Sequence, residues 1–308
     1  MKYEEWLKIW LVNYVKPSVK ERTYLRYEQL IRSHIVAKIG GTEVNELTPI
    51  VLQSLVTDLL NSGNWKTGKG LSASVVNTTI SLIQNSLKTA HLVGIASEYA
   101  ANKIKRPKLK GKKIECFTWV EQKTIVNYVR ISGRDKLFGI VLCLYTGLRI
   151  GELLALTWSD IDFFKGLLYV SKTCHDGNDG KNHIRIIDSP KTVNSRRVIP
   201  LPKPILITLK SLRRRSMCEY IVADRDKPVF VRSYQKTFEY MLIKLNIPHR
   251  GFHSLRHTFA TRAIECGIDV KTLAELLGHK NATITLNRYA HSLLEHKVDM
   301  MSRLGKMM

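Results

Sequence analysis

The sequence has no long apolar segment. None of its uncharged apolar runs approaches the roughly 20 residues that a helix needs to cross a bilayer. Its N-terminus, MKYEEWLKIW, carries acidic side chains where a secretory signal begins with basic ones. We therefore expect no membrane span, no export signal and a cytoplasmic protein.

Paired cysteines are also missing. The chain has five cysteines, and they are scattered along it without a C-x-x-C motif: Cys116, Cys143, Cys174, Cys218 and Cys266. A disulfide framework would need an even number of cysteines at paired spacings. This pattern indicates a reducing compartment.

Acidic residues are scarce relative to basic ones. The chain has 26 Asp and Glu against 49 Lys and Arg, which gives a formal net charge of +23. Such an excess predicts a polyanionic partner, and nucleic acid is the leading candidate. An anionic membrane surface is disfavoured because no isolated basic amphipathic helix stands out. The alternative is a protein that is merely basic.

The first hundred residues have apolar side chains at helical spacing, which predicts a bundle of about four helices. The first helix carries the aromatic stripe Trp6, Trp10 and Tyr14, which we interpret as core rather than as a platform for stacking bases. Later helices are expected at Thr23–His34, at Pro49–Leu60 with Thr48 as the N-cap, and at Leu71–Leu92.

A basic segment, KIKRPKLKGKK, follows this region, and seven of its eleven residues are Lys or Arg. Pro107 and Gly111 interrupt any helix, so we expect an extended linker over residues 101–116 between a domain at 1–100 and a second domain. The segment is either a solvated tether or a strap along a phosphate backbone. The strap would use Lys103, Lys105, Arg106, Lys108, Lys110, Lys112 and Lys113.

The second half mixes helical and strand patterns. The T-x-x-E motif Thr118–Glu121 predicts a capped helix, and the apolar segment Leu137–Leu156 predicts another. GLLYVSKT, HIRIIDS and SRRVIPL have the composition of short strands. Further helices are expected from Ser233 to Leu245 and from Asp269 to Gly278. The fold class is therefore mainly α, with a small antiparallel β-sheet in the second domain.

The stretch HSLRH has two histidines, His253 and His257, at the spacing of helical zinc ligands. A zinc protease helix would read H-E-x-x-H, but here Arg256 lies between the histidines and would repel a divalent cation. We therefore predict no metal. The remaining alternatives are a core helix with satisfied polar groups and a site that binds an anion.

A second arginine supports the anion site. Arg149 lies in the apolar segment expected to be helical, where a charge is costly unless it is paired. Glu152, three residues later, could form a buried structural ion pair with it. Two arginines and several histidines in apolar helices instead suggest a shared phosphate, which guanidinium groups bind bidentately.

Five motifs stand in order over residues 117–291: TGLRIGELLAL, PKTVNSRRVIPL, HSLRHTFAT, LLGHKNATIT and RYAH. This region resembles the catalytic domain of the tyrosine recombinases, the phage integrase family. Residues 1–100 resemble the family's core-binding domain more loosely, through helix pattern and position. The resemblance implies a two-domain clamp around duplex DNA.

The resemblance also implies a phosphate-cleaving site. Tyr289 would be the nucleophile that forms a 3′-phosphotyrosyl bond, and Arg149 and Arg256 would hold the nonbridging oxygens of the scissile phosphate. Lys191, on the turn before the last strand, would be the general acid for the leaving 5′-oxygen. No metal, ATP or other cofactor is implied.

Three further residues complete this site by resemblance, and His257 is a separate candidate from its position on the same helix. His253 would act in proton transfer and phosphate positioning, and His279 would donate another hydrogen bond to the phosphate. Glu152 occupies the family's acidic position and would support the site. His257 would give similar support, with simple packing as the alternative.

The resemblance implies a site-specific recombinase, most simply the integrase of a phage or conjugative mobile element. Its partners would be double-stranded DNA, three further copies of the chain in a tetramer and possible accessory DNA-bending proteins. The tail at 292–308 would pack on a neighbouring subunit or on its own domain. The alternatives are a Xer-like resolution recombinase, a type IB topoisomerase and a DNA-binding regulator that does not cleave.

Overall fold

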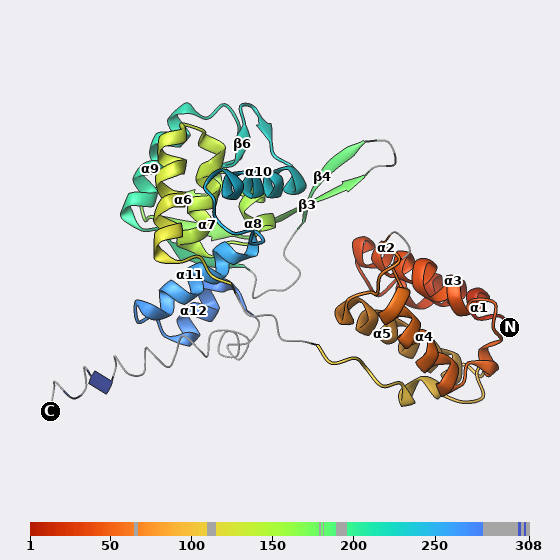
Figure 1. The fold of residues 1–308 in the computed structure, drawn as a ribbon. Coiled ribbons are helices and arrows are strands. Elements are labelled where there is room, and N and C mark those ends of the chain that lie inside the picture. The colour runs from red at the N-terminus through yellow and green to blue at the C-terminus, as the bar shows by residue number, and fades with distance from the viewer. Residues whose placement is uncertain are drawn as a thin grey trace. The chain divides into compact units, whose positions relative to one another are not determined.

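The computed structural model describes residues 1–64, 67–109, 115–178, 180, 182–188, 196–279, 301, 302 and 305. The chain divides into two compact units, Met1–Lys112 and Lys113–Met308 (Figure 1). Each unit has its own hydrophobic core. Both are mainly helical, and the strands lie in the second unit. The fold class predicted from the sequence is confirmed. Within the described ranges, no helix combines the length and apolarity that crossing a bilayer requires.

The first unit is a bundle of helices. Its longer helices are α1 (Tyr3–Trp10), α2 (Glu21–Leu30), α4 (Pro49–Ser62) and α5 (Ala73–Leu92), with the short α3 (Ala37–Ile39) between them. Single π-helical turns, Leu11–Val15 and Ile31–Val36, extend α1 and α2. Short 3-10 turns lie at Val44–Glu46 and Ala100–Lys103.

Helix α1 is fixed against α5 by its aromatic side chains. Tyr3 and Trp6 are almost fully buried, and both bond to Ser86: the Tyr3 hydroxyl lies 2.6 Å from the Ser86 hydroxyl, and Trp6 Nε1 donates to the Ser86 carbonyl at 3.0 Å. The interpretation of the aromatic stripe as core is confirmed for Trp6 and Trp10. Tyr14 is 45% exposed and lies at the edge of the core.

The predicted helix boundaries hold where a cap specifies them. The Thr48 side chain accepts from the Val51 N–H, and Pro49 begins α4. Helix α5 begins at Ala73, two residues after the expected start, because Ser72 caps it through the Val75 N–H. Helix α2 begins at Glu21, two residues before the expected start.

The first residues of the predicted linker belong to the first unit. Ala101 and Ile104 are buried in its core, and the backbone N–H of Lys105 donates to the Gln53 side chain at 2.9 Å. The Arg106 guanidinium donates to three groups of α5, on Asn77, Ser81 and Gln84. Residues 110–114 lie outside the described ranges, so the structure places only part of the basic segment.

The second unit contains the remaining helices. Helices α6 (Trp119–Ser132), α7 (Phe138–Thr146) and α8 (Ile150–Ala155) precede the strands, and α9 (Lys203–Arg215), α10 (Val231–Lys244), α11 (His253–Glu265) and α12 (Val270–Leu277) follow β5. Short 3-10 turns lie at Asp135–Leu137 and Trp158–Asp160. The capping box of Thr118 and Glu121 is confirmed, as are the Asp269 cap and the end of α12 at Gly278.

The strands form separate antiparallel pieces. Strands β1 (Ile161–Asp162), β2 (Leu167–Val170) and β5 (Arg197–Pro200) make a sheet in the order β1-β2-β5, with Leu168 opposite Ile199. Strands β3 (Thr173–Asn178) and β4 (His183–Asp188) make a separate hairpin, and β6 (Ala223–Asp224) pairs with β7 (Lys227–Pro228). The three predicted strands exist as β2, β4 and β5, but they do not share one sheet.

The β3–β4 hairpin explains two errors in the sequence prediction. Strand β3 reads TCHDGN, which contains few of the β-branched residues by which strands are found. Its Asp176 carboxylate accepts from the backbone N–H groups of Val231 and Arg232 at 2.8 and 2.9 Å. Helix α10 therefore begins at Val231, and the predicted Ser233 cap is wrong, because a carboxylate distant in sequence caps the helix earlier.

The predicted helix at Leu137–Leu156 is also wrong as a single element. Helix α7 ends at Thr146, and Gly147 adopts a left-handed conformation with φ of +65°. Arg149 is consequently the N-cap of α8 and not an interior helical residue. The break exposes the backbone of this turn to side chains of the candidate site.

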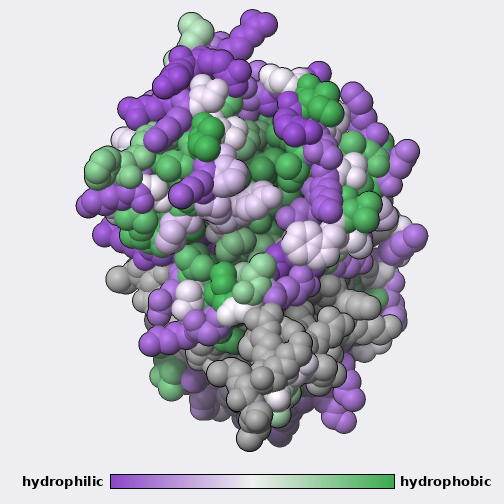
Figure 2. Space-filling view, turned by 90° about the vertical axis from the view of Figure 1, so that its left-hand side faces the viewer, coloured by the Kyte–Doolittle hydropathy of each residue, from purple (hydrophilic) through white to green (hydrophobic). Residues whose placement is uncertain are grey.

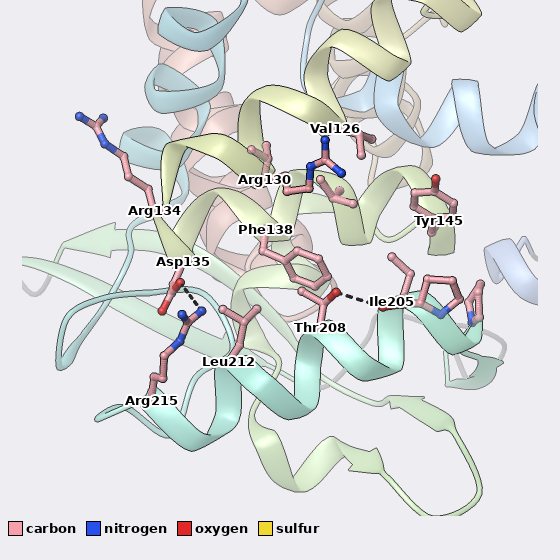
Figure 3. A pocket seen from close by; sticks show the side chains of 15 residues that line it. Val126, Arg130, Arg134, Asp135, Phe138, Tyr145, Ile205, Thr208, Leu212 and Arg215 are labelled. Carbon is pink, nitrogen blue, oxygen red and sulfur yellow. Dashed lines mark hydrogen bonds and ion pairs between the residues drawn. The ribbon is translucent and has the colours of Figure 1, made fainter.

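An apolar groove with a volume of about 390 Å³ lies between α6, α7 and α9. Figure 2 shows apolar side chains gathered in a hollow on this face, with hydrophilic groups around it. Phe138, Val126 and Leu212 line the groove, and Arg130 lies at its edge (Figure 3). None of the described candidate site residues lines it, so these residues meet elsewhere in the unit.

Substituting Gly147 by alanine should destabilise the second unit. The left-handed backbone costs a non-glycine residue about 1–2 kcal/mol, and the added Cβ would lie 2.5 Å from Phe259 and 2.8 Å from Leu277. Gly133→Ala is a matched control, since its φ is +63° but no atom lies within 4 Å of the added Cβ. Urea unfolding should show a loss for Gly147→Ala that exceeds the control by about 1–3 kcal/mol. Equal losses would contradict a packing role for Gly147.

Candidate active site

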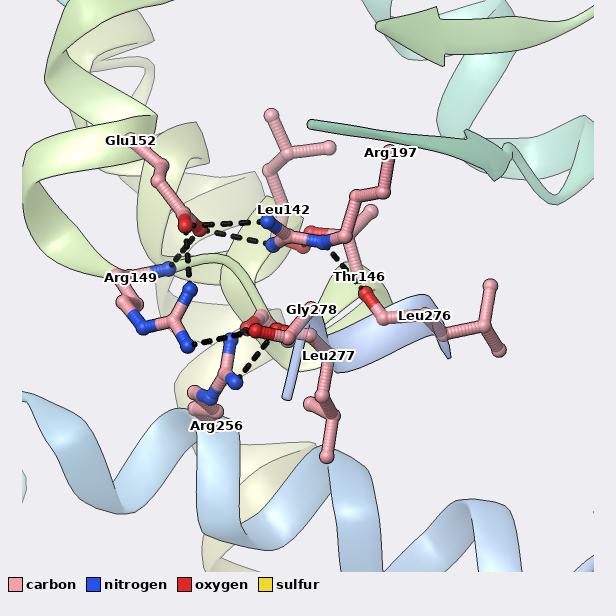
Figure 4. Close-up of polar contacts among 10 residues, drawn as sticks. Leu142, Thr146, Arg149, Glu152, Arg197, Arg256, Leu276, Leu277 and Gly278 are labelled. Carbon is pink, nitrogen blue, oxygen red and sulfur yellow. Dashed lines mark hydrogen bonds and ion pairs between the residues drawn. The ribbon is translucent and has the colours of Figure 1, made fainter. Parts of the chain in front are cut away.

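Three arginines converge on the last turn of α12 (Figure 4). Arg197 Nε donates to the Leu276 carbonyl at 2.6 Å, Arg256 Nη2 to the Leu277 carbonyl at 2.6 Å, and Arg149 Nη2 to the Gly278 carbonyl at 3.2 Å. The last carbonyls of a helix lack intrahelical donors and carry partial negative charge. The turn therefore attracts guanidinium groups from β5, α11 and the start of α8.

Arg256 is the most buried of the three arginines. Only 2% of its surface is exposed, and its Nη1 donates to the Gly147 carbonyl at 2.7 Å. The carbonyl belongs to the left-handed turn between α7 and α8, two residues before Arg149. A single guanidinium thus joins that turn to the end of α12, which places Arg149 and Arg256 in one cluster.

Glu152 is the carboxylate of this cluster. It is 4% exposed, and its Oε2 accepts from the Arg149 backbone N–H at 2.9 Å and from Arg197 Nη2 at 2.8 Å. Its Oε1 accepts from Arg149 Nη1 at 2.6 Å and from Arg197 Nη1 at 3.0 Å. The predicted pair of Arg149 and Glu152 is confirmed, and a second arginine shares the same carboxylate.

Electrostatics keep Glu152 ionised. Burial alone would raise the pKa of its carboxyl, but the hydrogen bonds and charge of Arg197, together with the charge of Arg149, outweigh burial and lower the pKa to about 2. Three guanidiniums and one carboxylate leave these four side chains with a net charge of +2. Such an excess of positive charge in a largely buried cluster favours an anionic ligand.

The three arginines differ in their access to a ligand. The Arg149 side chain is 37% exposed, whereas that of Arg197 is 5% exposed. Arg149 can therefore reach a ligand while one of its nitrogens remains on Glu152. The two alternatives for Arg149, a structural ion pair and an anion contact, are compatible in this geometry.

The histidines lie around this cluster on α11 and after α12. His253 is exposed at the start of α11, one turn before Arg256, and His257 is half-buried. The rings of His253 and His257 are 4.6 Å apart in an edge-to-face contact. His279 directly follows Gly278, and its backbone N–H donates to the Ala274 carbonyl at 3.0 Å.

The predicted site is thus brought together in part. The structure assembles Arg149, Glu152 and Arg256 and places His279 next to the turn that they contact. Lys191 and Tyr289 lie outside the described residues. Among the residues that are described, no group of three or more His, Cys, Asp or Glu side chains is arranged to hold a metal ion.

Arg197 is the residue that the sequence interpretation missed. By its composition, the motif SRRVIPL predicts only a strand. The available signal was the alternation of side chains along the strand. Arg197 is two residues from the buried Ile199, so both side chains lie on the same face of β5. An arginine on the inward face of a strand needs a partner, and Glu152 is that partner.

Comparison with known proteins defines the class. Residues 118–296 match the phage integrase family, and residues 2–60 match the phage integrase N-terminal SAM-like domain. The chain belongs to the phage integrase family, the tyrosine recombinases, which cut and rejoin DNA through a covalent tyrosine intermediate.

Individual relatives are consistent with this assignment. The chain is 31% identical to the tyrosine recombinase XerC-like of Caldanaerobacter subterraneus, over 96% of this chain and 81% of that protein. It is 31% identical to the transposase from transposon Tn916 of Enterococcus faecalis, over 54% of this chain and 45% of that protein. Its fold matches the Tn1549 transposon integrase in complex with a circular intermediate DNA, with a TM-score of 0.82, 22% identity and coverage of 99% of both chains.

The charge on Glu152 should appear in the pH dependence of stability. Because its folded-state pKa is lowered from 4.5 to about 2, the ionised carboxylate stabilises the fold above pH 4.5, and this contribution is lost as the pH falls toward 2. Glu152→Gln should lower the free energy of unfolding at pH 7 by about 3–5 kcal/mol, since it breaks a buried pair. It should also flatten the decline of stability between pH 4.5 and 2.

The measurement is urea unfolding followed by circular dichroism across that pH range. Asp135→Asn is the control, because Asp135 pairs with Arg215 while its side chain is 51% exposed, and an exposed pair contributes at most about 1 kcal/mol. If Glu152→Gln retained the acid dependence of the unsubstituted protein, the buried carboxylate would not be its source.

Proposed function

We propose that the chain is a site-specific recombinase whose nucleophile is Tyr289, and that the arginine cluster holds the scissile phosphate. The observation that carries this proposal is the net charge of +2 on Arg149, Arg197, Arg256 and Glu152, combined with the family assignment. Arg149 and Arg256 contact the nonbridging oxygens in this proposal.

In the proposed reaction, each P–O bond that breaks is replaced by a P–O bond that forms. The Tyr289 hydroxyl attacks the phosphorus atom, a P–O bond to tyrosine forms, and the P–O5′ bond breaks. The tyrosine proton passes to a base, for which His253 is the candidate, and Lys191 protonates the leaving 5′-oxygen. A free 5′-hydroxyl then attacks the phosphotyrosine and releases the enzyme.

The arginine cluster supports the two difficult parts of this reaction. The phosphorus becomes pentacovalent and gains charge, and preorganised cationic donors offset that charge without having to move. A tyrosine hydroxyl has an ordinary pKa of about 10 and is a weak nucleophile at neutral pH. Nearby guanidinium groups favour its phenolate form. In this proposal His279 donates a further hydrogen bond to the phosphate, and Glu152 and His257 support the site.

The DNA partner and the assembly follow from the same chemistry. Recombination of two duplexes requires four strand cleavages, and each protomer supplies one tyrosine, so the proposed complex is a tetramer on two DNA segments. The two units would hold the duplex between them as a clamp. The net charge of +23 supports binding to the phosphate backbone.

For the biological role, we favour the integrase of a mobile element acting on DNA in the cytoplasm, and its similarity to the Tn916 transposase supports this choice. The similarity to a XerC-like recombinase supports a resolution recombinase as the second candidate. Exchange assays distinguish them, because an integrase joins two different sites and a resolution recombinase acts on like sites. Accessory DNA-bending proteins and the packing of the tail at 292–308 stay predictions from the family resemblance.

Replacing Tyr289 by phenylalanine should abolish the covalent protein–DNA adduct. The substrate is a nicked suicide duplex carrying the element's ends, which traps the intermediate because the short 5′ fragment diffuses away. The adduct is detected by denaturing gel electrophoresis. Tyr240→Phe is the control, because Tyr240 is 76% exposed on α10 and should leave the yield unchanged.

An adduct that persists in Tyr289→Phe would show that another residue is the nucleophile. A protein that binds the ends without ever forming an adduct would be a non-cleaving regulator. Relaxation of supercoiled plasmid without exchange between sites would identify a type IB topoisomerase.

The basic segment can be tested as a strap by neutralising Lys103, Lys105 and Lys108, which are all exposed. Their replacement by glutamine should weaken binding to all DNA sequences alike, because phosphate contacts carry no base information. The slope of log affinity against log salt should fall by roughly 0.9 for each phosphate that the variant no longer neutralises. Fluorescence anisotropy measures both effects. An unchanged slope would leave the segment as a tether.

A further inference from the structure

We infer that Arg197 is a positioning residue that keeps the charge of Arg149 available to the scissile phosphate. The inference rests on the proposed function, since it concerns how the same site is charged. Arg197 lies on β5, only 5% of its side chain is exposed, and it does not need to touch the DNA.

The Glu152 carboxylate is bound differently by its two arginines. Both of its oxygens are within hydrogen-bond distance of Arg197, through Nη1 at 3.0 Å and Nη2 at 2.8 Å. Arg149 meets the carboxylate through one side-chain nitrogen, Nη1, at 2.6 Å, while its Nη2 donates to the Gly278 carbonyl. Arg197 therefore binds the Glu152 carboxylate through two nitrogens, whereas the Arg149 side chain binds it through one (Figure 4).

This geometry determines how much positive charge remains at Arg149 for the phosphate. Arg149, Arg197 and Glu152 together carry +1, so one positive charge remains at Arg149, the most exposed of the three. Without the Arg197 charge, Arg149 and Glu152 would sum to zero. The carboxylate would then be free to bind Arg149 at two points, as carboxylates do with guanidinium forks. The phosphate site would lose a charge without any change at a residue that contacts DNA.

The third bond of Arg197 extends this role to α12. Its Nε donates to the Leu276 carbonyl at 2.6 Å, two residues before the Gly278 carbonyl that Arg149 contacts. One guanidinium therefore fixes both the carboxylate that orients Arg149 and the turn that precedes His279.

The test compares single-turnover adduct formation for Arg197→Gln and for the double variant Arg197→Gln/Glu152→Gln. The single variant should slow cleavage by roughly 10- to 100-fold, less than the loss of a donor that touches the reacting group. DNA affinity should change by less than about threefold, because most of the affinity comes from phosphate contacts elsewhere. The double variant returns the trio to +1 and should recover part of the rate. Arg197→Lys, which retains the charge with fewer donors, should fall between the unsubstituted protein and Arg197→Gln.

This rescue separates positioning from simple structural support. A purely structural defect would follow stability, so the rate of the double variant would recover only together with its thermal stability, whereas charge compensation raises the rate at unchanged stability. Arg262→Gln is the matched control, because Arg262 is also largely buried, pairs with a carboxylate on Glu265 and donates to a backbone carbonyl, that of Phe117. It should reduce thermal stability and leave the cleavage rate within about threefold, since it removes no charge from the arginine cluster.

Each outcome decides the inference. A double variant no faster than Arg197→Gln overturns charge compensation, and so does an Arg197→Lys rate as low as that of Arg197→Gln. If Arg197→Gln does not fold, as judged by circular dichroism, the comparison of Arg197→Lys with Arg197→Lys/Glu152→Gln decides. The trio carries +1 in the first and +2 in the second, so at unchanged folding the double variant must be at least as fast as Arg197→Lys, and a slower double variant overturns the inference. The unsubstituted protein and Tyr289→Phe are assayed alongside. Absence of an adduct from the unsubstituted protein would refute the proposed function and not the role of Arg197 alone.

Discussion

The second unit depends on one arrangement: the last carbonyls of α12 are bound by guanidinium groups from three other elements. Arginine side chains are costly to bury unless every donor finds an acceptor. The free carbonyls at the end of a helix provide acceptors without adding a full negative charge that would cancel the guanidiniums. The cluster can therefore be packed and still keep the positive charge that a phosphate requires.

Glu152 sets how much of that charge remains. A single carboxylate shared by Arg149 and Arg197 orients both side chains while neutralising one charge. Its pKa stays low because Arg197 and Arg149 outweigh the effect of burial. The left-handed turn at Gly147 also helps to build the cluster. Its carbonyl accepts a hydrogen bond from Arg256, and the turn places Arg149 at a helix terminus.

The sequence predicted the structure correctly where the information is local. Capping residues identified the starts of α4, α6 and α12, and hydrophobic spacing identified both cores. It failed where a distant residue decides. Asp176 caps α10 from a hairpin more than fifty residues away, and β3 has a composition that local propensity does not recognise as a strand. The pairing of Arg197 with Glu152 spans 45 residues and was missed for the same reason.

By itself, the sequence determined the fold class, the basic character and the family, because composition, helical periodicity and ordered motifs are properties of the chain. It also identified Arg149, Glu152 and Arg256 as members of one site. Only the tertiary structure decided how they are held: Arg149 at an N-cap, Arg256 buried between two turns, and Arg197 as the second partner of Glu152. Those relations depend on which carbonyls and carboxylates lie within hydrogen-bond distance, and folding, not sequence spacing, sets that distance.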